Sequence, residues 1–501
     1  MLLPLLLVPL QLAAAADLLS ARAWTGFSKL DGSLEFPELA LPELRDKKNL
    51  GLAFSGGGVR AYTATLGHLR GLLDIGLLQQ ARYVSGVSGG SWAAAAYTFH
   101  DPSAEHTVSG APVARNDSEL LGVYVPPAAL GFSELDEMPV RSAFHAATIG
   151  VGMTPLTGPE WVNKVQDVFL EPVGVPAIGN SSFTWNANTS AEICLRNPAE
   201  PLSLAVAGQR EYGAPPYVIF GVTLMGPLDS TPLALDNRSY TVFDATPLYI
   251  GQARKEPVTF HGRKGEHPPI KDITLPVGGL LEPFAVGGKP PARALGPSSP
   301  ASALLQVPAP PTKFALANAV AASSFFPGDV EGWLSRATAK ELGLTLPFWA
   351  PADSGEQESP TVEAAVPRET LMLIGDGGLS ENTDMTSLLR RRVPRIVMFE
   401  TTDTTLNSDW NPLTHPNPTT NDIDDEFSAF FGLVSAKGLC YCWRRYCCCC
   451  YAHSHVCVCV CVCVCAVAVC CFVHMAFASC HVLITAVQWR RQFPHGLGPP
   501  S

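Results

Sequence analysis

The chain has 501 residues, of which 47% are hydrophobic and 16% are charged. This composition excludes a chain that is disordered throughout, a collagen and a coiled-coil rod, and the length allows one large domain or two or three ordinary ones. The 34 Lys and Arg residues and the 45 Asp and Glu residues give a net charge of −11, which argues against a basic surface for nucleic acid. Many apolar residues with few charges are typical of a large buried core or of a surface that handles lipids.

The N-terminus is apolar and ends in Ala-x-Ala before Asp17, which predicts a secretory signal peptide over residues 1–16. A packed apolar helix is the alternative, and Pro4 and Pro9 disfavour it. N-glycosylation sequons agree with a secreted glycoprotein, and they begin at Asn116, Asn180, Asn188 and Asn237. We therefore expect the protein to be secreted or to reside in the lumen of the secretory pathway.

Residues 45–435 have the pattern of one α/β catalytic domain. Strands and helices alternate in its first part, and they are expected in turn at residues 49–54, 59–75, 83–87 and 92–99. Alternation at this spacing predicts a central, mostly parallel sheet flanked by helices.

The later part of this domain is less regular. Further strands are expected at residues 217–224, 241–243, 371–374 and 395–399, and a helix at 385–392. Residues 257–311 are rich in Pro and Gly and show little periodicity, so we expect an insertion or a lid there. Regular structure returns at residues 314–326.

The strongest signal for chemistry is Gly-Val-Ser-Gly-Gly at residues 86–90, which places a G-x-S-x-G motif between a predicted strand and a predicted helix. A sharp turn of this kind strains the backbone of its serine, and the glycines avoid clashes around it. The Ser88 hydroxyl would lie beside a helix N-terminus, whose dipole favours developing negative charge. This motif predicts a nucleophile elbow at Ser88.

A second motif, Ser-Gly-Gly-Gly-Val-Arg, occupies residues 55–60. Consecutive glycines leave their N–H groups able to point at one oxygen, as an oxyanion hole requires. A tight turn or a nucleotide-phosphate loop is the alternative, but the sequence fits neither a Walker loop nor G-x-G-x-x-G. The motif precedes Ser88 by about thirty residues, so adjacent strands are able to bring the two together.

A third motif, Gly-Asp-Gly-Gly, occupies residues 375–378, directly after the predicted strand over 371–374. An Asp at the carboxyl end of a strand lies where parallel sheets build their sites. Asp376 would be able to take the Ser88 proton directly as a general base. An ordinary Asp-Gly turn is the alternative interpretation.

These three motifs, in this order, resemble those of the patatin-like and cytosolic phospholipase A2/lysophospholipase (phospholipase B) superfamily. The resemblance covers residues 45–405 and is loosest over 101–310. It implies an α/β sheet that carries a Ser–Asp dyad without a catalytic histidine. Ser88 would be the nucleophile and Asp376 the base.

The resemblance also implies the supporting residues of the site. The amides of Gly57 and Gly58 would be the oxyanion donors, and Arg60 would support the glycine loop or meet a substrate phosphate. Residues 321–327 would line the pocket. No metal ion and no other cofactor is implied.

The implied activity is a serine acyl hydrolase acting on glycerophospholipids or lysophospholipids at a membrane or micelle surface, through an acyl-enzyme. A Ser-His-Asp esterase of the α/β-hydrolase type is one alternative, with His415 as its main candidate histidine. His415 lies in a Pro-rich loop and is expected to be solvated. A non-catalytic lipid-binding protein that keeps the fold is the other alternative.

The tail over residues 436–501 differs in composition from the rest of the chain. It contains fourteen of the fifteen cysteines, and Val-Cys repeats five times over residues 456–465, so the body needs no disulfide framework. Because a TG dinucleotide repeat would encode the Val-Cys run, we interpret this tail as translated non-coding sequence. A transmembrane anchor is an alternative, since residues 456–487 contain no Asp, Glu, Lys or Arg. Metal binding by its Cys and His residues is a third, but the paired CxxC spacings of a zinc site are missing.

Overall fold

The computed structural model describes most of the chain between residues 18 and 424, together with the backbone of three strands in the tail. The described ranges are 18–28, 31–104, 112–122, 157–175, 181–228, 239–261, 272–296, 299–325, 340–352, 369–402, 407, 409–411, 414–415, 422–424, 457–464, 468–477 and 480–489. The predicted signal peptide over residues 1–16 lies outside them and stays a prediction. Of the four sequons, those at Asn116 and Asn188 lie within them, and both asparagines are exposed.

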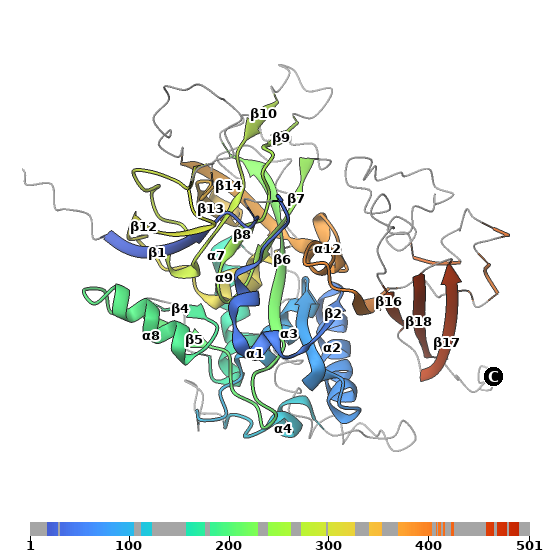
Figure 1. The fold of residues 1–501 in the computed structure, drawn as a ribbon. Helices are drawn as coiled ribbons and strands as arrows, with labels where there is room; N and C mark the ends of the chain where they lie inside the picture. The colour runs from blue at the N-terminus through green and yellow to red at the C-terminus, as the bar shows by residue number, and fades with distance from the viewer. Residues whose placement is uncertain are drawn as a thin grey trace, which may run out of the picture.

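A mixed 14-stranded sheet forms the centre of the molecule (Figure 1). Its strands in spatial order are β12 (Ser302–Pro308), β1 (Leu18–Trp24), β11 (Gly279–Leu281), β8 (Ile250–Gln252), β7 (Thr241–Ala245), β6 (Tyr217–Pro227), β3 (Ala81–Gly86), β2 (Lys48–Phe54), β15 (Arg395–Thr401), β16 (Cys457–Val464), β18 (Cys480–Trp489) and β17 (Ala468–Phe477). Two further strands lie off this path: β14 (Thr370–Asp376) pairs with β6, and β13 (Thr345–Phe348) pairs with β14.

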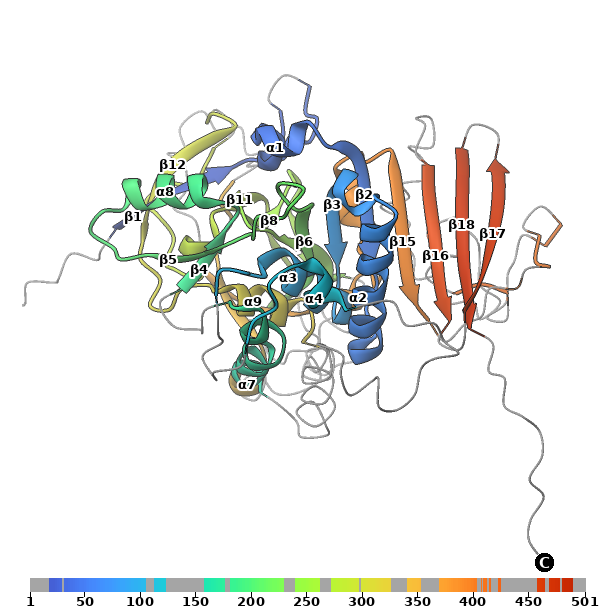
Figure 2. The ribbon, with the colours of Figure 1, turned by 90° about the horizontal axis from the view of Figure 1, so that it is seen from below.

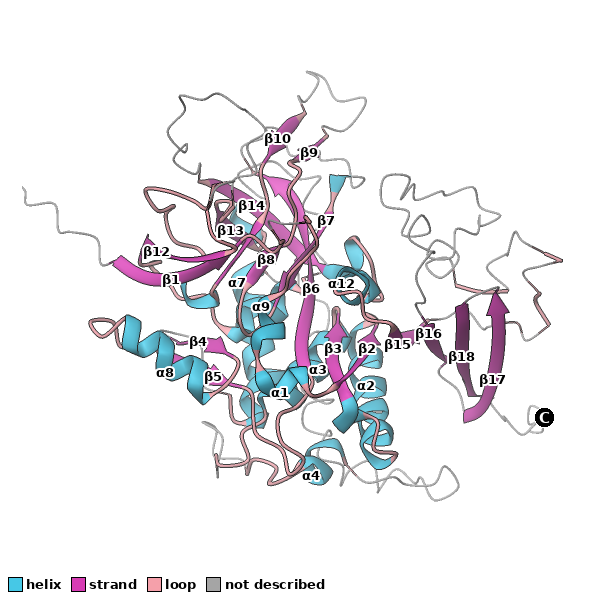
Figure 3. Cartoon of the chain, viewed as in Figure 1, coloured by secondary structure: helices cyan, strands magenta, loops and turns pink. Residues whose placement is uncertain are grey.

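Helices and short strands surround this sheet, as the colours of Figure 3 show. The helices are α1 (Pro42–Arg45), α2 (Gly58–Asp74), α3 (Gly89–Phe99), α4 (Asp117–Leu121), α7 (Gly158–Val165), α8 (Ala187–Arg196), α9 (Leu316–Ala322) and α12 (Met385–Arg390). A π-helical turn, Gln166–Leu170, follows α7. Two small sheets pair β4 (Ser181–Thr184) with β5 (Ser203–Val206), and β9 (Val258–Phe260) with β10 (Ile273–Leu275).

The two faces of the sheet carry separate apolar cores, because side chains alternate along each strand. On β2, Leu52 and Phe54 belong to the larger core, which includes apolar residues of α2 and α3. Ala53 belongs to the second core, together with Met385 and Leu388 of α12. The sheet is thus covered by helices on both faces, and the α/β fold class is confirmed.

The parallel part of the sheet is its middle. β6, β3, β2 and β15 run parallel to one another, whereas β6, β7, β8, β11, β1 and β12 are joined by antiparallel pairs. The predicted order strand–helix–strand–helix is confirmed as β2, α2, β3 and α3. The second helix begins at Gly89, three residues before its predicted start, because it opens directly at the serine turn.

Part of the stretch 257–311 differs from the predicted insertion or lid. It supplies β11 and β12, which belong to the central sheet on either side of β1. Phe284 and Ala285, in the 3-10 turn that follows β11, are fully buried. β11 spans three residues, which is too short for a period-two pattern to be visible in the sequence.

The tail extends the sheet beyond β15, as Figure 2 shows. β16 runs parallel to β15 and to β18, and β17 pairs antiparallel with β18. Strict Val-Cys alternation has the period of a strand, which agrees with β16. Among the described residues, none of the helices combines the length and the apolar character that crossing a membrane requires. The interpretation of the tail as non-coding sequence stays a prediction, which a transcript spanning the junction near residue 436 would test.

Candidate active site

Ser88 lies on the sharp turn between β3 and α3. Its backbone has φ 50° and ψ −125°, a strained conformation for a residue other than glycine. Close packing explains the glycines that follow it. A Cβ on Gly89 would lie 1.9 Å from the carbonyl oxygen of Gly58, and a Cβ on Gly90 would lie 2.6 Å from that of Phe54. The turn is therefore pressed against the glycine loop.

The glycine loop joins β2 to α2 beside this turn. Gly57 has φ 133° and Gly58 has φ 62°, conformations that favour glycine. The N–H of Gly56 donates to the Asn382 carbonyl (3.0 Å). No acceptor is recorded within the described residues for the N–H of Gly57 or Gly58, both at the N-terminus of α2. Two donors are thus available for a developing negative charge.

Asp376 reaches the serine turn because β6 is longer than its neighbour β3. One edge of β6 pairs in parallel with β3 over residues 217–220 and in antiparallel with β14 over 222–227. β3 and β14 therefore approach each other end to end along this edge, and their carboxyl ends meet. The sequence analysis expected Asp376 at the end of a parallel strand; β14 is antiparallel, and the length of β6 makes the meeting possible.

Asp376 is 5% exposed, and its carboxyl group accepts a hydrogen bond from the Gly378 N–H at 2.8 Å. Burial raises its pKa from 3.8 to about 6, and hydrogen bonds from the Gly378 N–H and the Ser88 hydroxyl act in the opposite direction. The two residues singled out by the sequence motifs therefore interact directly. A buried carboxylate with a raised pKa is suited to take a proton near neutral pH.

One carbonyl group joins the loops that carry these two residues. The Ser323 carbonyl oxygen accepts the N–H of Ser88 at 2.9 Å and the N–H of Gly377 at 3.1 Å. The Phe325 carbonyl oxygen accepts the N–H of Asp376 at 3.2 Å. Sequence analysis expected residues 321–327 to line a pocket. It missed these hydrogen bonds, because main-chain hydrogen bonds do not depend on side-chain identity.

Asn382 is a second residue that sequence analysis missed. Besides its carbonyl bond to Gly56, it packs its side chain against two glycines. A Cβ on Gly56 would lie 2.1 Å from the Asn382 amide oxygen, and a Cβ on Gly378 would lie 2.8 Å from it. Asn382 therefore lies between the glycine loop and the Asp376 loop. Its only signal in the sequence is a position six residues after Asp376.

The remaining candidates lie at the surface. Arg60 is exposed in the first turn of α2. His415 is exposed, its Nδ1 lies 3.0 Å from the Thr414 hydroxyl, and its carbonyl accepts the indole N–H of Trp410 at 2.9 Å. In the described part of the chain, Asp376 is the titratable group that interacts with Ser88. The described residues contain no group of three or more His, Cys, Asp or Glu placed to hold a metal ion.

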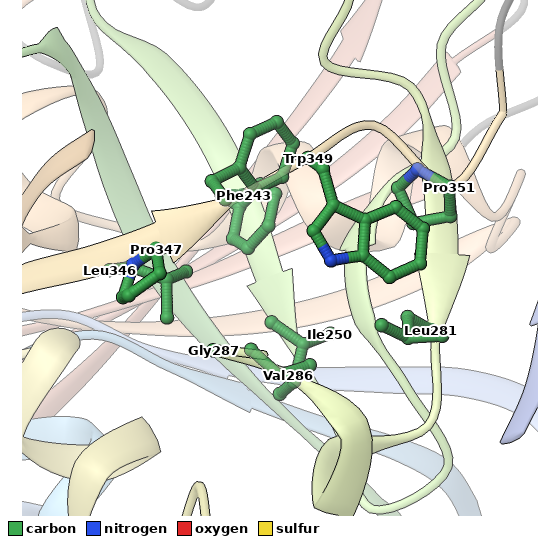
Figure 4. A pocket seen from close by; sticks show the side chains of 10 residues that line it. Phe243, Ile250, Leu281, Val286, Gly287, Leu346, Pro347, Trp349 and Pro351 are labelled. Carbon is green, nitrogen blue, oxygen red and sulfur yellow. The ribbon is translucent and has the colours of Figure 1, made fainter. Parts of the chain in front are cut away.

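A small apolar pocket lies elsewhere in the molecule (Figure 4). Its walls come from β7, β8, β11 and β13 and the residues next to them, with Phe243, Leu281 and Trp349 among the side chains. None of the ten residues that line it belongs to the glycine loop, the serine turn or the Asp376 loop. The pocket is therefore separate from the candidate active site.

The family model of the patatin-like phospholipases matches residues 52–147, a segment that includes both the glycine loop and the serine turn. Residues 52–147 are therefore similar to the patatin-like phospholipases. Ser88 and the glycines at 56–58 lie within the matched segment, and Asp376 lies beyond it.

Several known proteins are similar to this chain over short stretches. Cytosolic phospholipase A2 zeta of Mus musculus is 51% identical over 49 residues, which are 10% of this chain and 6% of the relative. Cytosolic phospholipase A2 beta of Homo sapiens is 36% identical over 74 residues, 15% of this chain and 8% of the relative. The solved structure of human GIVD cytosolic phospholipase A2 is 15% identical with a TM-score of 0.33, and the comparison covers 70% of this chain and 45% of that one. The matches thus span less than half of each relative's length.

Proposed function

We propose that this protein is a serine acyl hydrolase that cleaves acyl esters of glycerophospholipids or lysophospholipids with a Ser88–Asp376 dyad. The observation that carries the proposal is the direct interaction of a strained serine with a buried carboxyl group. The N–H groups of Gly57 and Gly58 beside them, which have no acceptor among the described residues, supply the other component that acyl transfer requires. The similarity of residues 52–147 to the patatin-like phospholipases supports a lipid ester as the substrate class.

In the proposed reaction, the Ser88 oxygen attacks the acyl carbonyl carbon while Asp376 takes the hydroxyl proton. The carbonyl electron pair moves to the oxygen, which accepts hydrogen bonds from the Gly57 and Gly58 N–H groups. Collapse of this intermediate expels the alcohol oxygen of the lipid, which takes the proton from Asp376, and leaves an acyl-enzyme. Water then attacks the acyl group with Asp376 again as the base, and this step releases the fatty acid and free Ser88.

The substrate is proposed to approach the glycine loop from the side on which Arg60 lies. Arg60 is exposed in the first turn of α2, two residues after Gly58, so its guanidinium is proposed to meet the lipid phosphate. The proposed partner is therefore a phospholipid or lysophospholipid surface. Each step relies on side chains and main-chain N–H groups of this chain, and we propose that hydrolysis continues in the presence of a chelator.

The test is fatty-acid release from phosphatidylcholine and lysophosphatidylcholine by the full chain, with EDTA present. We expect release by the wild type and a loss of about 10³-fold or more in Ser88→Ala, since no other nucleophile replaces the hydroxyl. His415→Ala is the control for the esterase alternative and is expected to keep the rate within about twofold. Loss of activity in His415→Ala would overturn the dyad. A folded wild type that binds lipid vesicles without releasing fatty acid would indicate the lipid-binding alternative.

The pH dependence of the rate follows from the raised pKa of Asp376, about 6. Asp376 acts as a base only when ionised, so the rate is expected to fall by about tenfold per pH unit below pH 6 and to be constant above about pH 7. The measurement is the rate of acyl-enzyme formation between pH 4 and pH 8, with circular dichroism as a check on folding. A constant rate down to pH 4 would contradict a base with this pKa.

A further inference from the structure

The segment Ser323-Ser324-Phe325, which follows α9, holds the two halves of the site together. Its carbonyl groups accept the N–H groups of Ser88, Gly377 and Asp376. The acceptors are the carbonyl groups of Ser323 and Phe325. Between these two residues, the Ser324 hydroxyl accepts a hydrogen bond from the indole N–H of Trp161 at 3.1 Å. This hydrogen bond is buried, and it ties the segment to α7.

Trp161 is itself held firmly. It is 6% exposed, and its ring lies 5.8 Å from that of Trp92 in a cluster that also contains Phe169. The helix that carries it begins with a capping box between Thr157 and Glu160, which fixes the start of α7. Ring packing and the capped start of α7 therefore hold the Trp161 indole N–H in place for its hydrogen bond to Ser324.

Ser324 connects Trp161 to the residues that bind the site. Its hydroxyl accepts from Trp161 and donates to the Val320 carbonyl at 2.8 Å, which closes the end of α9. Both neighbours of Ser324 bind the site through their carbonyl groups. A displacement of Ser324 would thus lengthen the bonds that align Ser88 with Asp376.

We propose that Trp161 is a positioning residue for the Ser88–Asp376 dyad and acts through Ser324. This inference rests on the proposed function. Loss of the Trp161 hydrogen bond would allow residues 323–325 to shift and would let water reach Asp376. Misalignment of Ser88 would lower the rate at every pH above the pKa of Asp376. More water around the Asp376 carboxyl group would lower its pKa.

The test compares two Trp→Phe variants of the full chain. Trp161→Phe removes the donated hydrogen bond, and we expect kcat to fall by about 10- to 100-fold with KM unchanged within about twofold. We also expect the acid limb of its pH profile to move below that of the wild type. Trp92→Phe is the matched control, because this indole N–H is buried in the same cluster and has no acceptor among the described residues. It is expected to keep both the rate and the pH profile.

Ser324→Ala supplies a second, independent variant, which also serves if Trp161→Phe does not fold. It removes the acceptor, so its loss of kcat should match that of Trp161→Phe, and the double variant should lose no more than either single one. The positioning role would be overturned if Trp161→Phe and Trp92→Phe lowered kcat equally, or if the losses of Trp161→Phe and Ser324→Ala added up in the double variant. An unchanged pH profile in Trp161→Phe would also overturn it. An inactive wild type would overturn the proposed function and this inference together, whereas an active wild type with an unaffected Trp161→Phe overturns the inference alone.

Discussion

Asp376→Asn is expected to lower the rate of fatty-acid release by about 10² to 10⁴-fold, the usual contribution of a general base. The substitution keeps the shape of the side chain and an oxygen able to accept from the Gly378 N–H, but it removes the atom that takes the Ser88 proton. Single-turnover release from lysophosphatidylcholine would measure the loss. A rate near that of the wild type would show that another group takes the proton.

The same substitution is expected to stabilise the fold at neutral pH. A rise in the Asp376 pKa from 3.8 to about 6 corresponds to about 3 kcal/mol of unfavourable free energy for the ionised, buried group. This cost is present above pH 6 and disappears below about pH 4, where the carboxyl group is protonated in both states. Urea unfolding at pH 7 should therefore show a gain for Asp376→Asn that is absent at pH 4.

Asp384→Asn is the matched control for the effect of Asp376→Asn on the rate of fatty-acid release. Asp384 is also buried, and burial, together with the nearby Glu381 and Asp244 charges, raises its pKa well above the ordinary value. An amide keeps the shape of this side chain without an unfavourable buried charge, and Ser387 retains an oxygen to donate to. Its positive φ of 54° also suits asparagine. We expect the rate to stay within about twofold of the wild type.

Gly89→Ala is expected to lower the rate by about 10² to 10³-fold, as does the loss of an oxyanion donor in other acyl-transfer enzymes. The added Cβ would lie 1.9 Å from the carbonyl oxygen of Gly58 and 3.1 Å from the Cβ of Ala61. A main-chain atom is not able to rotate away, so the start of α2 must move relative to Ser88. That movement displaces the N–H groups of Gly57 and Gly58 from the reacting oxygen.

Gly71→Ala is the control for the effect of adding a methyl group to a glycine. Gly71 lies within α2, and among the described residues no atom outside the adjoining backbone of this helix lies within 4 Å of the position its Cβ would take. Replacing a glycine in a helix by alanine raises stability by about 0.5–1 kcal/mol, and the rate should be unchanged. Measurements of rate and thermal unfolding on both variants separate damage to the oxyanion loop from loss of folding. Full activity in a folded Gly89→Ala would contradict the close packing of the two loops.

Much of the local structure around the site could be predicted because its signals are short in range. The run 49–54 and the apolar spacing after Val59 predict β2 and α2, and the glycines around Ser88 predict the turn between β3 and α3. Each of these elements depends on residues within a few positions of one another. The three-residue strand β11 lacks such a signal, and the sequence analysis missed the place of both β11 and β12 in the sheet.

The meeting of the two halves of the site is decided by tertiary structure. Gly-Asp-Gly-Gly identifies Asp376 as a candidate, but its contact with Ser88 depends on an antiparallel β14 that approaches β3 end to end along the long edge of β6. Strand pairing and the Ser323 carbonyl bonds use main-chain groups, which every residue carries, so no motif reveals them. The sequence by itself determined the chemical groups and their local turns, since those require particular side chains or glycine. Their distances, burial and raised pKa come from residues far apart in the chain and exist only once the sheet is assembled.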